Sequence, residues 1–575
     1  MTTPLPDDDR AAGAATTANP RRLLGLPWIA WVIALCAAVA HIAPFWRAEL
    51  SQRGEWTFEE NLTISPDQMQ YRVWLRQTQR EGPVITNRFT TEPNRAHLPV
   101  YFFWAVGKAG RAVGTTPERA YAYAGSVLAI LLTLMVYATV RRFIADPTQR
   151  LWVVVPLMVA GGLGGHIKVL QQIPALAASS TFQRFLLEPI ELFPVFEDYR
   201  SHYLVKVLLD THSIALWIVG LGAVLALHSA ITRLTPARIA AAMGMFVLMT
   251  VMHVYEGITL LAIAWGVALC CWPMIPDRRR LVGLLAGCTL AVGVCYAVLG
   301  ALYARSGLPL PDWRAINILV STLLIAYPIS WALIAWGGLA RWRIGGLRER
   351  FLFGWILGCT IVTLSGPFFP YPDRGTMTMQ VPLAILGAIA YFAKWPRVSA
   401  RHAAILALVG GAAPLWLAAR TWHFSGFRTD APFQYVNPSH RAARDALRAS
   451  ADTSQILLAD VPDLLWLAPT FPGRLYVGHF FLTVNFTSKV AALREALANP
   501  SLMPALLETS RADYLFVNGT HDPARFAFLP GLVPLAREPV GWLFRVERSA
   551  QASSASRTRA PGPIFTTPNM TSAAP

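Results

Sequence analysis

The sequence has 575 residues, of which 54% are hydrophobic and only 14% are charged, and its mean hydropathy is +0.40. A soluble protein usually has about 25% charged residues, so this composition excludes an ordinary soluble globular protein. Apolar runs of about 20 residues recur along most of the chain, and a run of that length can cross a bilayer. The formal net charge of +17 comes from basic residues that cluster between these runs, so we expect membrane lipids and no nucleic acid as partners.

The N-terminal segment 1–22 is predicted to be disordered and cytoplasmic. The apolar run Leu23–Phe45 is too long for a signal peptide, so we expect an uncleaved membrane span. Ten further apolar runs bring the total to about eleven spans and predict a mainly α-helical, polytopic transmembrane bundle. These runs lie near 119–143, 151–170, 206–231, 238–253, 257–275, 281–303, 315–338, 351–367, 376–394 and 403–420.

The connections between these runs alternate in length and charge. Those at 141–150, 276–280 and 340–350 are short and basic, whereas those at 46–118 and 171–205 are long. Because basic connections stay in the cytoplasm, the pattern predicts an inside N-terminus, an outside C-terminus and two long outer loops. We therefore expect a multi-pass protein of a bacterial-type inner (plasma) membrane.

The polar segment Ser65–Gly82, directly after the first span, is predicted to be an amphipathic helix on the outer membrane surface. Ser65 is a suitable N-cap, and it forms a capping box with Gln68. Asp67 then lies in the first turn, where it either complements the helix dipole or takes part in chemistry. The predicted apolar face carries Tyr71, Trp74, Leu75 and Thr78, and the predicted polar face carries Arg72, Arg76, Gln79 and Arg80.

Other ionisable residues fall in the same predicted outer compartment. Asp210 and His212 lie at the mouth of a span, where ionisable groups are costly and tend to be functional. His253 and Glu256 lie in a tight turn between two apolar runs and share one helical face. Three roles are open for this pair: binding a metal, hydrogen-bonding an acceptor, or pairing with each other. A His-x-x-Glu pair alone is weak evidence for a metal site, because such a site needs more ligands.

Two further acid-containing segments are candidates. Glu197 and Asp198 lie in the second outer loop, where they are catalytic or simply solvated. Asp373 and Arg374 precede a late span. Arginine suits a phosphate through its bidentate fork, and the alternative is a loop cation near lipid headgroups.

The pattern changes between residues 421 and 548. Short β-like runs alternate there with helix-like runs, which predicts a small α/β domain. An odd number of spans places this domain outside the membrane, and the Ser-, Thr-, Ala- and Pro-rich tail 549–575 is predicted to be disordered. The β-like runs are 456–460, 474–478 and 513–519, and the helix-like runs are 487–498 and 504–510.

At this level of detail the chain resembles GT-C glycosyltransferases, the integral membrane enzymes that include protein O-mannosyltransferases and aminoarabinose transferases. The resemblance covers mainly residues 23–143. Gln68 departs from the family pattern, because a second acid often stands at that place. Asp67 and Tyr71 match the family's DExxY element, His97, Pro99, Tyr101 and Phe102 match its second element, and Arg95 lies near the place of a family lysine.

The resemblance implies a GT-C-like transmembrane domain over 23–420, with catalytic outer loops 46–118 and 171–205. It implies transfer of a sugar from a polyprenyl-phosphate donor to a glycan, lipid or protein acceptor at the outer face. Asp67 would be the general base, and a divalent cation is left open as a cofactor. The further catalytic candidates are Glu197, Asp198 and Asp210, and the substrate-binding candidates are Tyr71, Arg95, His97, His212, His253, Glu256, Asp373 and Arg374.

Two functions from other classes remain as alternatives. One is a transporter or flippase for lipid-linked envelope material, which would show internal repeats and charged residues at mid-membrane. The other is a non-enzymatic envelope assembly protein whose outer domain binds a partner. The absence of a clear repeat and the gathering of ionisable residues on one predicted face favour the glycosyltransferase.

Overall fold

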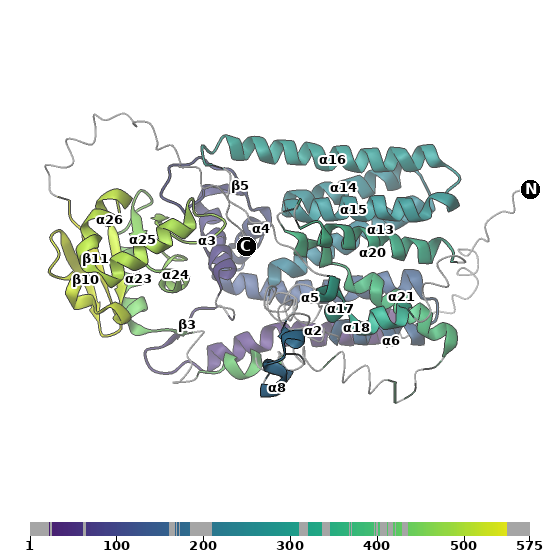
Figure 1. The fold of residues 1–575 in the computed structure, drawn as a ribbon, viewed down its shortest axis with the longest axis horizontal. Coiled ribbons are helices and arrows are strands. Elements are labelled where there is room, and N and C mark those ends of the chain that lie inside the picture. The colour runs from purple at the N-terminus through teal and green to yellow at the C-terminus, as the bar shows by residue number, and fades with distance from the viewer. Residues whose placement is uncertain are drawn as a thin grey trace, which may run out of the picture. The chain divides into compact units, whose positions relative to one another are not determined.

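The computed structural model describes 22–23, 26–60, 62, 65–159, 167, 170–171, 173–183, 207, 210–309, 320–335, 345–366, 368–369, 371–395, 397, 399, 401–402, 411, 418–419, 421–427 and 435–548. The chain divides into two compact units, one formed by 1–87 with 94–435 and the other by 88–93 with 436–575. The first unit is mainly helical and the second contains a five-stranded sheet (Figure 1). The expectation of a mainly helical chain with a small α/β part is therefore confirmed.

Within the described residues of the first unit, six helices are long and apolar enough to cross a membrane. The expected total of about eleven spans stays a prediction. The six are α2 (Trp28–Leu50), α5 (Pro117–Phe143), α13 (Thr211–Thr232), α15 (Val254–Cys271) with η2 (Trp272–Met274), α16 (Arg278–Ala304), and α21 (Gln380–Lys394) with the preceding η4 (Pro372–Thr376). Other helices of this unit are α6 (Pro147–Val159), α8 (Pro174–Ala177), α9 (Ser180–Phe182), α14 (Pro236–Met252), α17 (Val320–Ala326), α18 (Pro328–Leu333) and α20 (Leu347–Leu364).

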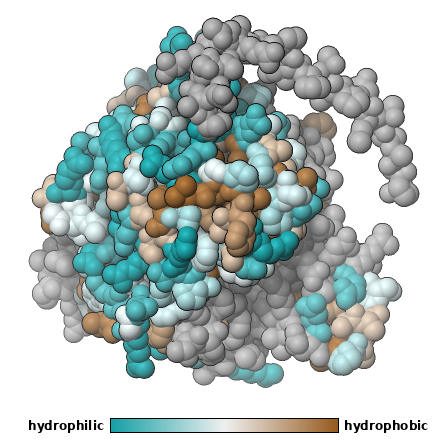
Figure 2. Space-filling model, turned by 90° about the vertical axis from the view of Figure 1, so that its left-hand side faces the viewer, coloured by the Kyte–Doolittle hydropathy of each residue, from teal (hydrophilic) through white to brown (hydrophobic). Residues whose placement is uncertain are grey.

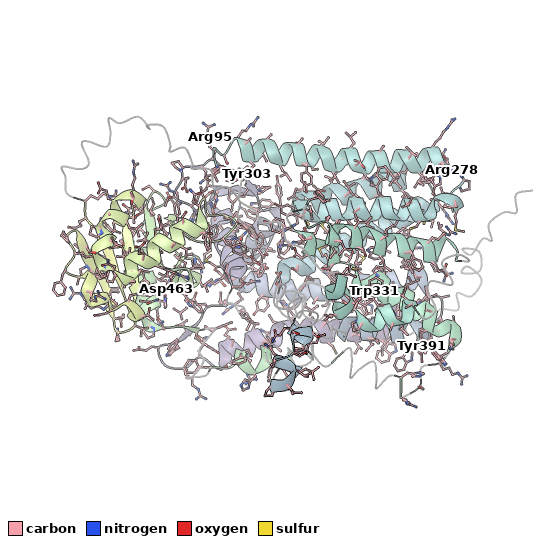
Figure 3. All side chains as sticks on the ribbon, viewed as in Figure 1. Arg95, Arg278, Tyr303, Trp331, Tyr391 and Asp463 are labelled. Carbon is pink, nitrogen blue, oxygen red and sulfur yellow. The ribbon has the colours of Figure 1, made fainter. Side chains whose placement is uncertain are left out.

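The ends of these helices form two groups. Arg350 Nη1 donates to Cys270 O at 3.3 Å, which joins the start of α20 to the end of α15. Arg278 and Tyr303 mark the two ends of α16, and Arg95 lies beside Tyr303 (Figure 3). Basic connections therefore gather at one end of the bundle. Which end faces the outside stays a prediction.

Helices α15 and α20 pack with their backbones almost in contact. A Cβ atom added at Gly354 would lie 2.3 Å from Val267 Cα, and one added at Gly358 would lie 2.4 Å from Ile263 Cα. The two glycines form a G-x-x-x-G pair on α20, a spacing that lets membrane helices approach closely. Because Glu256 is in the first turn of α15 and η4 follows α20, this packing controls which side chains of the two segments can meet.

We therefore expect Gly358→Leu to force α15 and α20 apart and to destabilise the bundle by about 1–3 kcal/mol, as overpacking of a tight interface does. The measurement is the Tm of the purified protein in detergent. Gly293→Leu on α16 is the matched control, because a Cβ at Gly293 meets no atom within 4 Å. Equal Tm values for both variants would contradict the close packing.

The segment after α2 forms the helix that the sequence predicts. Helix α3 (Pro66–Glu81) begins at Ser65, whose Oγ accepts a hydrogen bond from Gln68 N at 3.2 Å. It ends at Gly82, whose φ of 89° favours glycine. The short strands β4 (Val84–Ile85) and β5 (Leu98–Pro99) then pair antiparallel and lead into α4 (Tyr101–Ala112).

The predicted polar face of α3 is wrong in one respect. Arg72 is buried, with only 4% of its surface exposed, because α3 packs against α4 and the start of α5. Leu75, Phe103 and Ala120 belong to the hydrophobic cluster at this contact. Protein therefore covers both sides of the helix, and charged partners accompany the buried arginine.

The second unit has the strand order β10-β11-β9-β7-β8. β7 pairs parallel with β8 and with β9, and β11 pairs antiparallel with β9 and β10. The three predicted strand runs and both helix runs are confirmed, whereas the β10–β11 hairpin was missed, because Pro534 weakens its strand pattern. The elements are β7 (Ile456–Leu458), β8 (Arg474–Leu475), β9 (Tyr514–Asn518), β10 (Leu532–Glu538), β11 (Gly541–Val546), α23 (Pro438–Ser450), α24 (Val461–Leu467), α25 (Phe486–Ala498), α26 (Met503–Ser510), η5 (Pro500–Leu502), η6 (Gly519–His521) and η7 (Pro523–Phe526).

Helix α23 packs against the hairpin, and the opposite side of β10 carries exposed apolar residues. Figure 2 shows apolar side chains gathered in the middle of a largely hydrophilic face. Val533, Leu535 and Val540 are the exposed apolar residues of the hairpin. The remaining short strands of the chain are β1 (Arg22–Leu23), β2 (Leu26–Pro27), β3 (Thr57–Phe58) and β6 (Tyr435–Val436).

Residues 88–93 come from the first long loop of the chain but are part of the second unit. Phe89 is fully buried there, and Thr483 Oγ1 donates to its carbonyl oxygen at 2.6 Å. Lys489 Nζ lies 2.8 Å from Glu92 Oε1. Burial raises the pKa of Glu92, but hydrogen bonds from Lys489 and Thr90 outweigh burial and leave this pKa below its usual value of 4.5.

A carboxyl with a lowered pKa in the folded state stabilises the fold above its unfolded pKa and loses that contribution as the pH falls through the folded value. We therefore expect Glu92→Gln to increase hydrogen–deuterium exchange in residues 474–490 at pH 7. The difference from the wild type should shrink as the pH falls below 4.5. Glu508→Gln, at an exposed position on α26, is the control and should change nothing at either pH.

Candidate functional site

Glu256 is the charged centre of the first unit, and its side chain is completely buried. Arg374 Nη1 donates to Glu256 Oε1 at 3.2 Å, and His253 Nδ1 contacts Glu256 Oε2. Asp373 Oδ2 lies 3.8 Å from Arg374 Nε. The two oxygens of one buried carboxylate thus hold an imidazole and a guanidinium side by side, and His253 and Arg374 keep 22% and 18% of their side-chain surface exposed.

Local backbone geometry places these groups. His253 is a single extended residue, with φ −157° and ψ 107°, between the end of α14 and the start of α15. Arg374 lies in η4, which packs against α20. Gly375 permits that packing, because a Cβ there would lie 2.3 Å from Thr363 Oγ1 and 2.5 Å from Cys359 O. A helix junction and a short 3-10 helix therefore carry His253 and Arg374.

Asp67, on α3, interacts with this cluster through its charge. It is half-buried in the first turn of that helix, and its negative charge interacts favourably with Arg374. Tyr71, one turn further along α3, also lies within electrostatic reach of Arg374. Asp67, Tyr71, Glu256 and Arg374 come from segments far apart in the sequence, and the structure brings them to one end of the bundle.

An aromatic layer lies between α3 and the Glu256 cluster. The ring of Tyr71 stacks on Phe103 with centroids 5.0 Å apart and meets the ring of His212 at 5.3 Å. His212 in turn lies 6.0 Å from the ring of His253. Predicted substrate-binding residues of three helices thus form a continuous line of rings, with Tyr121 stacked against Phe103 at 6.1 Å.

Asp210 has a definite structural role in this layer. It is the N-cap of α13, and its Oδ1 accepts from the backbone N–H of His212 at 3.1 Å. Its other oxygen accepts from Ser213 Oγ. Tyr121 Oη also donates to Oδ1 at 3.4 Å, so both oxygens hold the start of the helix, and a catalytic role for Asp210 stays a prediction.

Two predicted residues, Arg95 and His97, contact the end of α16. Arg95 N donates to Ser306 O at 3.4 Å, and the ring of His97 meets the ring of Tyr303 at 5.4 Å. Burial lowers the pKa of His97, although its hydrogen bond to Arg95 O opposes the shift. Glu197 and Asp198 lie outside the described residues.

Comparison with known proteins places this arrangement in a fold. No family model and no curated protein matches the sequence. The apo oligosaccharyltransferase of Archaeoglobus fulgidus superposes with a TM-score of 0.56 at 12% identity, over 87% of this chain and 70% of that one. The same archaeal enzyme, AglB, in complex with an inhibitory peptide and a dolichol-phosphate gives a TM-score of 0.53 over the same shares at 12% identity.

The chain has the GT-C fold. A mycobacterial arabinofuranosyltransferase, AftD, is also similar, with a TM-score of 0.49 and 14% identity over 89% of this chain and 40% of that one. The family-level resemblance drawn from Asp67, Tyr71 and the residues near His97 is therefore confirmed for the fold. At these identities the similarity does not carry over individual residue roles.

A metal ion has no complete binding site in the described part of this GT-C chain. No three His, Cys, Asp or Glu side chains among those residues lie together in a way that could hold one. Glu256, which a metal would need, is instead paired with His253 and Arg374. A divalent cofactor stays a prediction, and we derive no step through it.

Sequence reasoning missed a set of charged residues beside Asp67. Arg76 Nε lies 2.6 Å from Glu118 Oε1, and Arg72 Nη2 lies 2.8 Å from Glu59 Oε2. The available signal in the sequence was a pair of arginines four residues apart on one helix, followed by an acid at the mouth of the next span. Their spacing shows only that they share a helix face, and not that a second helix covers it.

We expect Arg374→Met to destabilise the GT-C unit by about 3–5 kcal/mol, because it leaves the buried Glu256 carboxylate without its cation. Glu256→Gln combined with Arg374→Met should cost less than the sum of the two single changes, since the double variant leaves no unpaired charge. The measurement is thermal unfolding in detergent of the wild type, the two single variants and the double variant, which together form a double-mutant cycle. Additive losses would show that the two side chains do not interact.

Proposed function

We propose that this chain is a membrane glycosyltransferase that moves a sugar from a polyprenyl-phosphate donor to an acceptor at the outer face of the membrane. The proposal rests first on the fold, because the chain superposes on structures of an oligosaccharyltransferase with TM-scores above 0.5. One of them was solved with a dolichol-phosphate, a lipid-linked phosphate. The acceptor is a glycan, lipid or protein.

The observation that carries the proposal is the series of contacts that joins α3 to the buried ion pair: Tyr71 contacts His212, His212 contacts His253, and His253 and Arg374 both contact Glu256. Asp67 lies one turn before Tyr71 on α3, and its charge interacts favourably with Arg374. A glycosyl transfer from a lipid phosphate needs a base for the acceptor hydroxyl and positive charge for the departing phosphate. Asp67 is half-buried and Arg374 is partly exposed, so both are within reach of a bound substrate. One carboxylate and one guanidinium at the same end of the bundle meet both needs.

In the proposed reaction, Asp67 accepts the proton of the acceptor hydroxyl as its oxygen bonds to the anomeric carbon of the donor sugar. The bond between that carbon and the phosphate oxygen breaks, and its electron pair leaves with the polyprenyl phosphate. Arg374, held by Glu256 and Asp373, stabilises the charge on that phosphate through its planar fork of donors. The aromatic layer of Tyr71 and His212 offers flat apolar surface beside the sugar.

The arrangement of charges argues against a transporter. A transporter is expected to place its ionisable groups near the middle of the membrane, where the substrate crosses. Here Glu256 is in the first turn of α15, Asp67 is in the first turn of α3 and Arg374 precedes α21. Helix ends, and not helix centres, carry the cluster, which suits chemistry at one membrane surface.

Asp67→Asn tests the proposal. We expect it to slow sugar transfer by about 10²–10⁴-fold, the range that a general base contributes, while the Tm in detergent stays unchanged. The probes are synthetic farnesyl phosphates linked to mannose, glucose or arabinofuranose, and the readout is release of farnesyl phosphate with a membrane extract as the source of acceptor.

Glu55→Gln is the matched control, because Glu55 is an exposed acid of the same loop. It should release farnesyl phosphate at the wild-type rate. An Asp67→Asn variant that is as active as the wild type would remove Asp67 as the base. A wild-type protein that is inactive with all three donors, with and without EDTA or added divalent cations, would overturn the proposed donor class.

A further inference from the structure

Four charged side chains are buried together where α3 meets α5. Glu59, Arg72 and Glu118 keep 10%, 5% and 2% of their side-chain surface exposed, and Arg76 keeps 34%. Arg72 Nη2 lies 2.8 Å from Glu59 Oε2, its Nε lies 3.9 Å from Glu118 Oε1, and Arg76 Nε lies 2.6 Å from the same oxygen. Two acids and two arginines balance, so the group carries no net charge.

Such a group is a poor source of net stability. Removing charges from water costs free energy that their mutual attraction repays only in part, and apolar replacements of similar volume are often neutral or stabilising. The contacts of the group do, however, constrain how α3 is placed against α5. Glu118 Oε1 accepts a hydrogen bond from Arg76 Nε and forms a longer ion pair with Arg72, one turn earlier on α3. Contacts to two successive turns hold both the rotation of that helix and its position along its axis.

The first turn of α5 also holds the helix on the other side of the aromatic layer. Tyr121 Oη accepts the backbone N–H of His212 at 3.0 Å, and Thr211 Oγ1 donates to Tyr121 O at 3.2 Å. Glu118 and Tyr121 are three residues apart and lie on one face of α5. One helical turn thus fixes α3, which carries Asp67, relative to α13, which carries His212.

We propose that Glu118 is a positioning residue that sets the placement of Asp67 relative to Arg374, so that the buried ion group serves the geometry of the reaction rather than the stability of the fold. This inference rests on the proposed function, since it concerns the same site. Arg72 is five residues after Asp67 on one rigid helix, so any rotation of α3 that breaks the group also turns Asp67 away. Misplacement by about 1 Å can slow an enzyme reaction about 10²-fold.

Two variants of Glu118 provide the test. Glu118→Asp keeps the charge but withdraws the carboxylate by one methylene, and Glu118→Gln removes the charge at constant size. We expect turnover of the farnesyl-phosphate donors to fall about tenfold in Glu118→Asp and about 10²-fold in Glu118→Gln, with the KM for donor unchanged in both. We also expect faster hydrogen–deuterium exchange in residues 66–81 of Glu118→Gln. A merely stabilising role would instead lower the amount of folded protein and leave turnover per folded molecule unchanged, which would overturn the proposal.

Glu49→Gln is the matched control. Glu49 pairs with Arg119 of the same helical turn of α5, but both side chains are about one-third exposed, and Arg119 pairs with Glu49 and Glu60 rather than with α3. It should change neither turnover nor exchange in residues 66–81. An equal effect of Glu49→Gln and Glu118→Gln would overturn the specific role of Glu118.

A third variant covers the case in which the Glu118 changes prevent folding. Glu59→Leu, Arg72→Met and Glu118→Leu together replace the buried charges with apolar side chains, and we expect a wild-type Tm with turnover reduced at least about tenfold. Wild-type turnover in this triple variant would overturn the proposal. If the wild type and Glu49→Gln release no farnesyl phosphate from any donor, the proposed function fails. The exchange of residues 66–81 then decides the positioning role alone, and unchanged exchange in Glu118→Gln overturns it.

Discussion

A buried carboxylate held by an arginine and a histidine is the constraint on which the first unit depends. Glu256 is completely buried, so its charge is tolerated only because Arg374 and His253 lie against its two oxygens. These partners come from η4 and from the break between α14 and α15. The helices that carry them can therefore occupy only a narrow range of relative positions.

Close packing of the helices in the bundle meets this constraint. Gly354 and Gly358 let α20 approach α15 so closely that their backbones are almost in contact. Gly375 then lets η4 turn back against α20 and directs Arg374 toward the start of α15. Glycines at the helix crossings thus fix the position of Arg374, because they allow the helices to approach closely.

The same dependence on packing explains why the predicted polar face of α3 is partly buried. Its sequence has the amphipathic spacing of a helix lying on lipid, but Arg72 and Arg76 point toward protein, where Glu59 and Glu118 pair with them. Helical periodicity shows which residues share a face and does not show what covers that face. Arg72 was therefore predicted on an exposed polar face, although it is among the most buried charged residues described.

Sequence alone determined the local elements and the class of the molecule. The long apolar runs predict membrane helices, Ser65 and Gly82 bound α3, and the alternation after residue 421 predicts the small α/β part, because each of these depends on neighbours within a few residues. Tertiary structure alone decided the site. Glu256 and Arg374 are 118 residues apart, and Asp67 reaches them only through the packing of α3 on α4 and α5. Sequence periodicity reports only on residues a few positions apart. Which of the predicted outer residues contact one another is therefore visible only in the tertiary structure.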